Sequence, residues 1–330
     1  MSLHPLLQAP AMADDLARVE RELRAAVMTD EPALTEMASH LIVAGGKRIR
    51  PLLALAAGAC AQDSDGPVPL EVILGGVSVE LVHLGSLYHD DVIDEAVTRR
   101  TVESVNAKWG NLRAILSGDF LLAKASEIAA GLGTEVAALL AATIGRLCEG
   151  EVAELETAYQ LDRSEDSYLR SIEGKTASLF SAATRIGAIV GGLPRDHVER
   201  LTEFGTAYGM AFQVIDDILD LIATDEQLGK PAGHDLLEGV YTLPVLRALQ
   251  EPDAHELAGL LGRPIEGEPW ARARVLIRNS GGVAHAVATA RHYTAYATEC
   301  LQPVGHRPAA QALIEAANHL LGTIGAVEAA

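Results

Sequence analysis

Aromatic residues are scarce in this sequence of 330 residues, where phenylalanine, tryptophan and tyrosine together make up 4% of the chain. Alanine and leucine dominate instead. Such a composition favours helices, because strands select aromatic and β-branched residues. No stretch shows the alternation of a half-buried strand, and no short-period repeat or sustained heptad is present. The sequence therefore predicts an all-α protein.

Cysteine is rare as well. The three cysteines, at positions 60, 148 and 300, show neither a CxxC motif nor the spacing of zinc ligands. They are typical of small buried residues in a reducing compartment, so we expect a cytoplasmic protein. Positive charge is in deficit, with 26 basic against 45 acidic residues and a net charge of −19. A chain this acidic is a poor candidate for general nucleic-acid binding.

No uninterrupted apolar run reaches the length of a membrane span. The longest candidate, residues 68–88, is broken by Glu71, Glu80 and His83. The first 20 residues lack the basic and apolar regions of a signal peptide. We therefore expect no transmembrane segment.

Two acidic triplets share the pattern Asp-Asp-x-x-Asp. The first ends a helix predicted over residues 70–94, and the second lies in a helix predicted over 198–222. Their members are Asp90, Asp91 and Asp94, and Asp216, Asp217 and Asp220.

On a helix, the first and last carboxylates of each triplet lie one turn apart on the same face. Carboxylates in an apolar helix repel one another and are costly to desolvate, so a cation is expected between them. Mg²⁺ prefers oxygen ligands and is commonly shared with substrate phosphates. A solvated acidic patch would explain one triplet, but two with identical spacing favour one metal site. Because that site needs both triplets, we predict a single domain over residues 1–330.

Basic residues flank the acidic helices, close to glycines or helix ends. Arginine and lysine bind phosphate, although surface solvation is their usual role and is favoured for Lys230 and Lys175 taken alone. The segment Gly-Gly-Lys-Arg-Ile-Arg-Pro at 45–51 and the pair Arg99-Arg100 are harder to explain as surface charge. A basic site beside an acidic metal site suggests two phosphorylated substrates that are held differently. Gly-Lys-Thr at 174–176 lacks the upstream glycine of a P-loop.

The sequence resembles the trans-polyprenyl (isoprenyl) diphosphate synthase family. The similarity spans roughly residues 45–246, and the matching stretches follow the family's order. They are GGKRIRP, HDDVIDEAVTRR, SGDFLLAKA, GKTASLF, FQVIDDILD, GKPAGHDLLEG and TLPVL. Together these motifs are highly specific, although a single DDxxD would not be.

The resemblance implies a single all-α helical bundle around a deep central cavity, the isoprenoid synthase fold, with C-terminal helices 270–324 packed on it. It implies a homodimer that condenses isopentenyl diphosphate with an allylic diphosphate. The reaction proceeds by Mg²⁺-assisted ionisation, condensation and proton elimination. Three Mg²⁺ ions are expected per site, held by Asp90, Asp94, Asp216 and Asp220.

The resemblance also assigns the substrate-binding residues. By their positions in the matching motifs, the residues that resemble the family's isopentenyl diphosphate site are Lys47, Arg50, His83 and Arg100. Those that resemble its allylic site are Arg99, Lys175, Thr176, Gln213 and Lys230. Of these, Lys175, Thr176 and Gln213 are expected near the reacting carbons as catalytic residues. Asp91 and Asp217 point away from their neighbours on a helix and are expected to support them, and His89 is expected to pack.

Two departures from the family pattern stand out. Thr101-Val102-Glu103 follows Arg100 where the family often has Gly-x-Pro. Val240 and Tyr241 occupy a segment that often contains a lysine, so one contact to the allylic diphosphate is missing.

Product length can be argued from side-chain size. In this family the growing chain extends along the helix that leads to the first acidic motif, and bulky aromatics four and five residues before it block the path. Here those positions are Ser86 and Gly85, and the next turns present Val82, Leu81 and Ser78. We therefore predict a medium- or long-chain all-trans product, with geranylgeranyl diphosphate as the alternative.

Three other functions fit the sequence less well. A terpene cyclase of the same fold would not need the second basic site. A His-Asp metal phosphohydrolase, suggested by His89-Asp90 and His234-Asp235, would need further histidines that the spacing does not supply. A non-catalytic subunit that regulates a partner synthase should have lost carboxylates from the acidic motifs, and all six are present.

Overall fold

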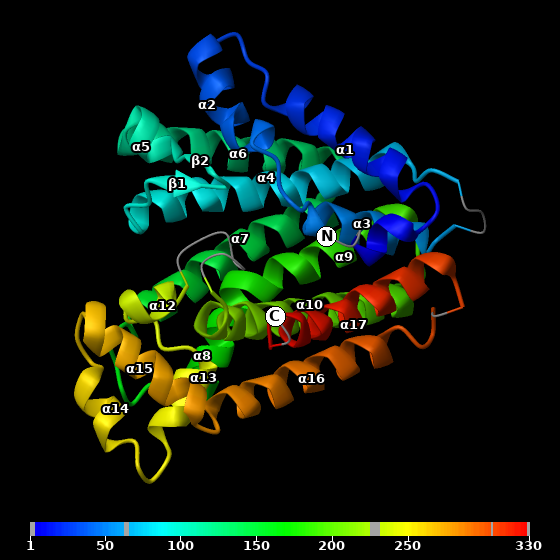
Figure 1. Cartoon of the computed structure of the whole chain (residues 1–330). Helices are drawn as coiled ribbons and strands as arrows, with labels where there is room; N and C mark the ends of the chain where they lie inside the picture. Colours follow the sequence, from blue (N-terminus) through cyan, green and yellow to red (C-terminus); the bar gives the residue numbers. More distant parts are fainter. Residues whose placement is uncertain (1–3, 63–65, 225–231, 305, 329–330) are drawn as a thin grey trace. The chain divides into compact units, whose positions relative to one another are not determined.

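A computed structural model describes residues 4–62, 66–224, 232–304 and 306–328 (Figure 1). Within these residues every regular element is helical except one pair of two-residue strands. The prediction of an all-α protein is therefore confirmed. The chain divides into two compact units, each assembled from three separate stretches. The single domain predicted for residues 1–330 stays a prediction.

Unit 1 contains residues 1–144, 179–202 and 302–313. Its elements are η1 (Pro5–Gln8), α1 (Met12–Ala26), α2 (Pro32–Val43), α3 (Ile49–Ala59), α4 (Leu70–Ile93), β1 (Thr98–Arg99), β2 (Val102–Glu103), α5 (Val105–Trp109), α6 (Asn111–Gly131), the first half of α7 (Thr134–Leu155), nearly all of α9 (Ser178–Gly191) and the starts of α10 (Arg195–Ile222) and α17 (Pro308–Glu328).

Unit 2 contains residues 145–178, 203–301 and 314–330. Its elements are the second half of α7, α8 (Glu165–Ile172), the π-helical turn η2 (Glu173–Ala177), most of α10, α12 (His234–Leu237), α13 (Leu243–Leu249), α14 (His255–Leu260), α15 (Gly267–Asn279), α16 (Gly282–Cys300) and the end of α17.

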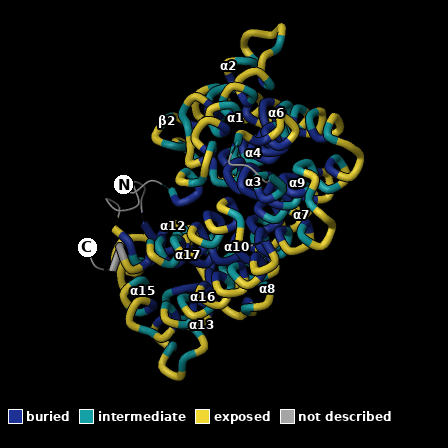
Figure 2. Tube along the Cα trace, turned by 90° about the vertical axis from the view of Figure 1, so that its right-hand side faces the viewer, coloured by how far each residue is buried: buried dark blue, intermediate teal, exposed yellow. Residues whose placement is uncertain are grey.

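Helix α4 forms the core of unit 1. Its apolar residues are fully buried along most of its length, as Figure 2 shows by its dark blue trace. It packs against α3 and α6, and small residues allow the backbones to approach closely. A Cβ atom at Gly85 would lie 3.1 Å from the carbonyl oxygen of Gly118 on α6. Among the described residues, α4 is also the one helix long and apolar enough to cross a membrane, but 67% of its apolar window is buried inside the protein.

A short antiparallel hairpin follows α4. Strands β1 and β2 pair Thr98 with Glu103 and Arg99 with Val102. The two turn residues between them, Arg100 and Thr101, have φ values of 52° and 66°, as a type I′ turn requires. Two-residue strands are too short for an alternation signal, and this turn lacks the usual Asn-Gly or Asp-Gly. The sequence pattern therefore could not reveal the hairpin.

Candidate functional site

The acidic end of α4 has the predicted helical geometry. The backbone N–H of Asp94 donates to the carbonyl of Asp90 at 2.8 Å, so these two residues lie one turn apart. Asp90 is half-buried and Asp94 is exposed. The C-terminal end of a helix already carries a partial negative charge, and carboxylates there are unfavourable without a cation. This end of α4 is therefore suited to binding a positive ion.

Asp91, between these two acids, has a different role. Its side chain is fully buried, and one carboxylate oxygen accepts a hydrogen bond from Nε of Arg99 at 2.6 Å. Burial raises the pKa of Asp91, while the charge of Arg99 lowers it. Asn106 donates to the Asp91 carbonyl at 2.9 Å. Asp91 thus fixes the position of Arg99, one of the predicted substrate-binding residues.

Arg100 is held by the loop that follows α2. Its Nη1 donates to the carbonyl oxygens of Gly45 and Leu41, the latter at 3.1 Å. A Cβ atom at Gly46 would lie 2.8 Å from the same nitrogen. Gly46 is therefore needed because the guanidinium lies directly against the backbone, whereas Gly45 has open space around it and a φ of 87°, which favours glycine.

A buried carboxylate, Glu80, lies among three arginines. Its Oε1 accepts a hydrogen bond from Nη1 of Arg48 at 3.0 Å and lies 3.9 Å from Nη2 of Arg100. Arg48 also bonds Glu20 at 2.5 Å. Burial raises the pKa of Glu80, whereas Arg48, Arg50 and Arg100 lower it. Sequence analysis missed Glu80, although a single acid inside an apolar helix is a signal that a positive partner lies nearby.

The predicted basic site is formed around Glu80. Arg50 stacks on Phe180 with its guanidinium carbon 4.5 Å from the ring centroid, and its pKa is lowered to about 10 by burial and the charge of Arg100, against the opposing effect of Glu80. Burial, followed by Arg50 and Arg100, lowers the pKa of His83 well below its ordinary value. His83 is therefore neutral at pH 7. Lys47 is exposed.

The small residues Gly85 and Ser86 on α4 are small for different reasons. Gly85 faces α6, so helix packing alone accounts for its lack of a side chain. His89 also lies against α6, where its Nε2 is 3.2 Å from the Ile115 carbonyl and a Cβ atom at Gly118 would collide with it. Ser86 is half-buried, and Leu81 and Val82 are fully buried. The prediction of a long product therefore depends on Ser86 more than on Gly85.

The second acidic motif lies in the last two turns of α10, within unit 2. Asp216 is exposed, whereas Asp217 and Asp220 are buried. Oδ2 of Asp220 accepts a bond from the backbone N–H of Asp235 at 3.4 Å, and its carbonyl accepts one from Gly233 at 2.7 Å. This motif also places acids at the negative end of a helix, as α4 does.

Thr176 and Gln213, two of the predicted catalytic residues, are in direct contact. The Thr176 hydroxyl donates to Oε1 of Gln213 at 2.7 Å, and Nε2 of Gln213 donates to Oδ1 of Asp217 at 2.7 Å. The other oxygen of Asp217 accepts a hydrogen bond from the hydroxyl of Tyr168. Burial raises the pKa of Asp217, against the opposing effect of both donors. Tyr168 had no signal in the sequence.

Lys175, the third predicted catalytic residue, lies in the π-helical turn η2. Its ammonium donates to Glu154 at 2.6 Å and lies 2.8 Å from Glu151, both on α7. Burial lowers the pKa of Lys175, but Glu154 and Glu151 together raise it above its ordinary value. A Cβ atom at Gly150 would lie 2.3 Å from the Lys175 backbone nitrogen, so a glycine is required where η2 crosses α7. π-helical turns often occur at functional sites.

The segment that lacks the family's lysine is anchored elsewhere. The buried hydroxyl of Tyr241 accepts a bond from the Gly262 N–H at 2.7 Å, and the Val240 N–H donates to the Asp235 carbonyl at 2.8 Å. Neither side chain offers a positive charge. Lys230, predicted for the same substrate, lies outside the described residues.

Carboxylates alone do not complete a metal site in the described part of the chain. No group of three or more His, Cys, Asp or Glu side chains there is close enough to hold a metal ion. The carboxylate pairs fit a hard divalent cation that takes its remaining ligands from water and substrate phosphate. His234, one of the histidines that suggested a metal phosphohydrolase, lies 3.4 Å from Glu238.

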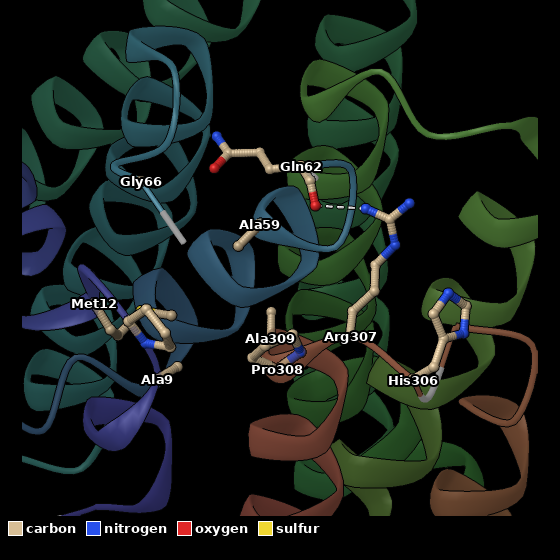
Figure 3. A pocket seen from close by; sticks show the side chains of 10 residues that line it. Ala9, Met12, Ala59, Gln62, Gly66, His306, Arg307, Pro308 and Ala309 are labelled. Carbon is tan, nitrogen blue, oxygen red and sulfur yellow. Dashed lines mark hydrogen bonds between the residues drawn. The ribbon is translucent and has the colours of Figure 1, made fainter. Parts of the chain in front are cut away.

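A separate pocket of about 210 Å³ in unit 1 contains none of the predicted site residues. Figure 3 shows it between the end of α3, the start of α1 and residues 306–309, where Arg307 donates to the Gln62 carbonyl at 2.5 Å.

Comparison with known proteins agrees with this geometry. The family model described as polyprenyl synthetase matches residues 31–269. Nonaprenyl diphosphate synthase of Mycobacterium tuberculosis is 39% identical over 308 residues, which cover 92% of this chain and 91% of that protein. Heptaprenyl diphosphate synthase component 2 of Geobacillus stearothermophilus is 42% identical over 284 residues, which cover 86% and 87%. The chain belongs to the polyprenyl synthetase family.

Solved structures extend the similarity to the fold. A crystal structure of a polyprenyl synthase from Caulobacter crescentus, complexed with calcium and isoprenyl diphosphate, has a TM-score of 0.89 and 34% sequence identity. It covers 97% of both chains. The isoprenoid synthase fold predicted from the motifs is therefore confirmed.

Glu80→Gln should lower the free energy of unfolding by about 3 kcal/mol, because removing one partner leaves buried arginine charge uncompensated. Denaturant unfolding measures this loss. The matched control is Glu20→Gln, which alters the more exposed acid bonded to the same Arg48 and should cost less than about 1 kcal/mol. Equal losses for both variants would contradict the central place given to Glu80.

Proposed function

We propose that the protein condenses isopentenyl diphosphate with an allylic diphosphate to give a medium- or long-chain all-trans polyprenyl diphosphate. One observation carries the proposal. Helix α4 bears carboxylates at its end and, two turns earlier, a neutral His83 beside arginines held by Glu80. One diphosphate can thus bind through metal and the other through cations alone. A terpene cyclase would have no use for the second arrangement.

The metal-free site is assigned to isopentenyl diphosphate. Arg50 and Arg100 remain charged although they are desolvated, and such charges attract phosphate far more strongly than solvated ones. Neutral His83 can donate one hydrogen bond to a phosphate oxygen without adding charge. Exposed Lys47 is free to move toward the ligand because its stem is flexible.

The metal site is assigned to the allylic diphosphate. Asp90, Asp94, Asp216 and Asp220 would hold Mg²⁺, with three ions per site. When bound, these ions neutralise the leaving diphosphate. The calcium in the Caulobacter structure supports a divalent ion as a ligand of this protein. Arg99, fixed by Asp91, adds positive charge from the protein, and Lys175 and Lys230 are assigned to the same diphosphate.

The reaction breaks the allylic carbon–oxygen bond and leaves an allylic cation. The double bond of isopentenyl diphosphate attacks that cation to form the new carbon–carbon bond, and loss of a proton restores an alkene. Thr176 and Gln213 present oxygen atoms that stabilise the cation. Val240, at the place of the family's lysine, contributes no charge, so the allylic diphosphate depends more on metal in this protein.

Asp90→Asn and Asp216→Asn should each lower kcat by at least about a hundredfold, because each removes a metal ligand whose charge stabilisation amounts to several kcal/mol. Incorporation of labelled isopentenyl diphosphate into lipid-soluble product measures the rate. The matched control, Asp196→Asn, alters an acid that is 80% exposed at the start of α10 and should have no effect. Chelation of divalent ions should abolish turnover and added Mg²⁺ restore it; turnover that persists in chelator would refute the metal assignment.

The product is assigned as longer than farnesyl, with medium or long chains, because Ser86 is a small residue at a position where an aromatic would block the growing chain. The names of the nonaprenyl and heptaprenyl relatives support this length. Cytoplasmic location is proposed because the three cysteines form no disulfide.

Ser86→Phe should shorten the main product, because an aromatic ring four residues before Asp90 fills the space into which the chain grows. Mass spectrometry of products from one allylic primer measures the length. Ser86→Ala keeps the position small and should leave the length unchanged. If both variants make wild-type products, the growing chain does not pass Ser86.

A homodimer is proposed through α6. This helix exposes Leu112, Ile115 and Leu116 at helical spacing, and Leu112 is 72% exposed. A contiguous exposed apolar face of this kind is typical of an interaction surface. A second copy of the chain would bury it.

Leu116→Glu should convert the dimer to a monomer, because burying a leucine contributes about 1.5–3 kcal/mol and a buried glutamate would be unpaired. Sedimentation velocity measures the mass. Val275→Glu, at an exposed apolar position on α15, is the control and should leave the dimer intact. A wild-type protein that sediments as a monomer would exclude this interface.

A further inference from the structure

Tyr168 is a buried residue of unit 2 that the reaction as described does not use. It is 1% exposed, and its hydroxyl bonds the carboxylate of Asp217 rather than a backbone carbonyl. The buried guanidinium of Arg163 lies 5.7 Å from its ring centroid, and Arg163 is itself anchored to Ser171 Oγ at 2.6 Å and to the Tyr241 carbonyl at 3.3 Å. The ring of Tyr168 is therefore held in one place.

The hydrogen bonds that begin at Tyr168 have a fixed direction. Nε2 of Gln213 can only donate, and it donates to the oxygen of Asp217 that Tyr168 does not occupy. This orients the amide so that Oε1 faces Thr176. A carbonyl oxygen can only accept, so the Thr176 hydroxyl must donate its one proton to Gln213. Its lone pairs are then the only hydrogen-bonding capacity that Thr176 has for any other group.

We propose that Tyr168 is a positioning residue for prenyl transfer, which acts through Asp217 and Gln213 to keep the oxygen of Thr176 electron-rich toward the allylic cation. This inference rests on the proposed function. A Thr176 hydroxyl that turned its proton toward the cation would destabilise it, because the positive end of the O–H dipole would face positive charge. Tyr168 touches no substrate. Its effect is to hold Asp217 so that the Gln213 amide cannot flip.

The test compares Tyr168→Phe with the wild-type full-length protein. Losing one hydrogen bond that sets this order should lower kcat about tenfold, the rate equivalent of one buried hydrogen bond. The KM for each diphosphate should change by less than about twofold, because no group that binds phosphate is altered. The matched control, Tyr208→Phe, removes a hydroxyl from another buried tyrosine of unit 2, which packs on Phe204 at 5.8 Å, and should leave kcat unchanged.

A double-mutant cycle separates positioning from general support of the fold. If Tyr168 acts through Thr176, then adding Tyr168→Phe to Thr176→Val should lower kcat by less than about twofold further. If the two losses multiply, or if the KM rises with kcat unchanged, the proposal is overturned. Thermal unfolding of each variant is recorded in parallel.

If Tyr168→Phe does not fold, Asp217→Asn disrupts the same series of hydrogen bonds with little change in side-chain volume. At saturating Mg²⁺ it should give a similar loss of kcat, which Thr176→Val again masks, and full activity of Asp217→Asn would overturn the proposal. Wild-type turnover of isopentenyl diphosphate tests the proposed function separately, so failure of that function is distinguishable from failure of this inference.

Discussion

The attraction between the Glu80 carboxylate and the arginines around it is the interaction on which unit 1 depends. A buried arginine without a partner costs several kcal/mol, and three of them lie within reach of this one carboxylate. Arg48 forms ion pairs with two acids, Glu80 and Glu20. Arg50 and Arg100 are only partly neutralised, so net positive charge remains where a phosphate is expected. Stability and ligand attraction are thus balanced in one cluster.

Unit 2 contains a charge cluster with an excess of negative rather than positive charge. Lys175 lies between two glutamates, so the cluster around this one cation is acidic overall. Together with the exposed Asp216 near the end of α10, it presents an environment that favours divalent cations.

Much of this could be predicted from the sequence because the residues concerned lie close together along the chain. The spacing of Asp90 and Asp94 predicted a shared helix face, and the ordered motifs predicted the family and its fold. What could not be predicted depends on contacts between distant segments. Lys47 and Arg48 are neighbours in the sequence, yet one is exposed and the other buried, because only Arg48 meets Glu20 and Glu80. A side chain at Gly85 would crowd the backbone of α6, and no residue spacing within α4 could show that contact.

The interleaved composition of the two units has a consequence for biosynthesis. Unit 1 draws on residues 302–313, and its segments 1–144 and 179–202 surround a stretch that belongs to unit 2. A nascent chain on the ribosome therefore holds an incomplete unit 1 until residue 313 has been made. During that interval the apolar helices at its centre lack some of their final cover, so this chain is exposed to aggregation for most of its translation time.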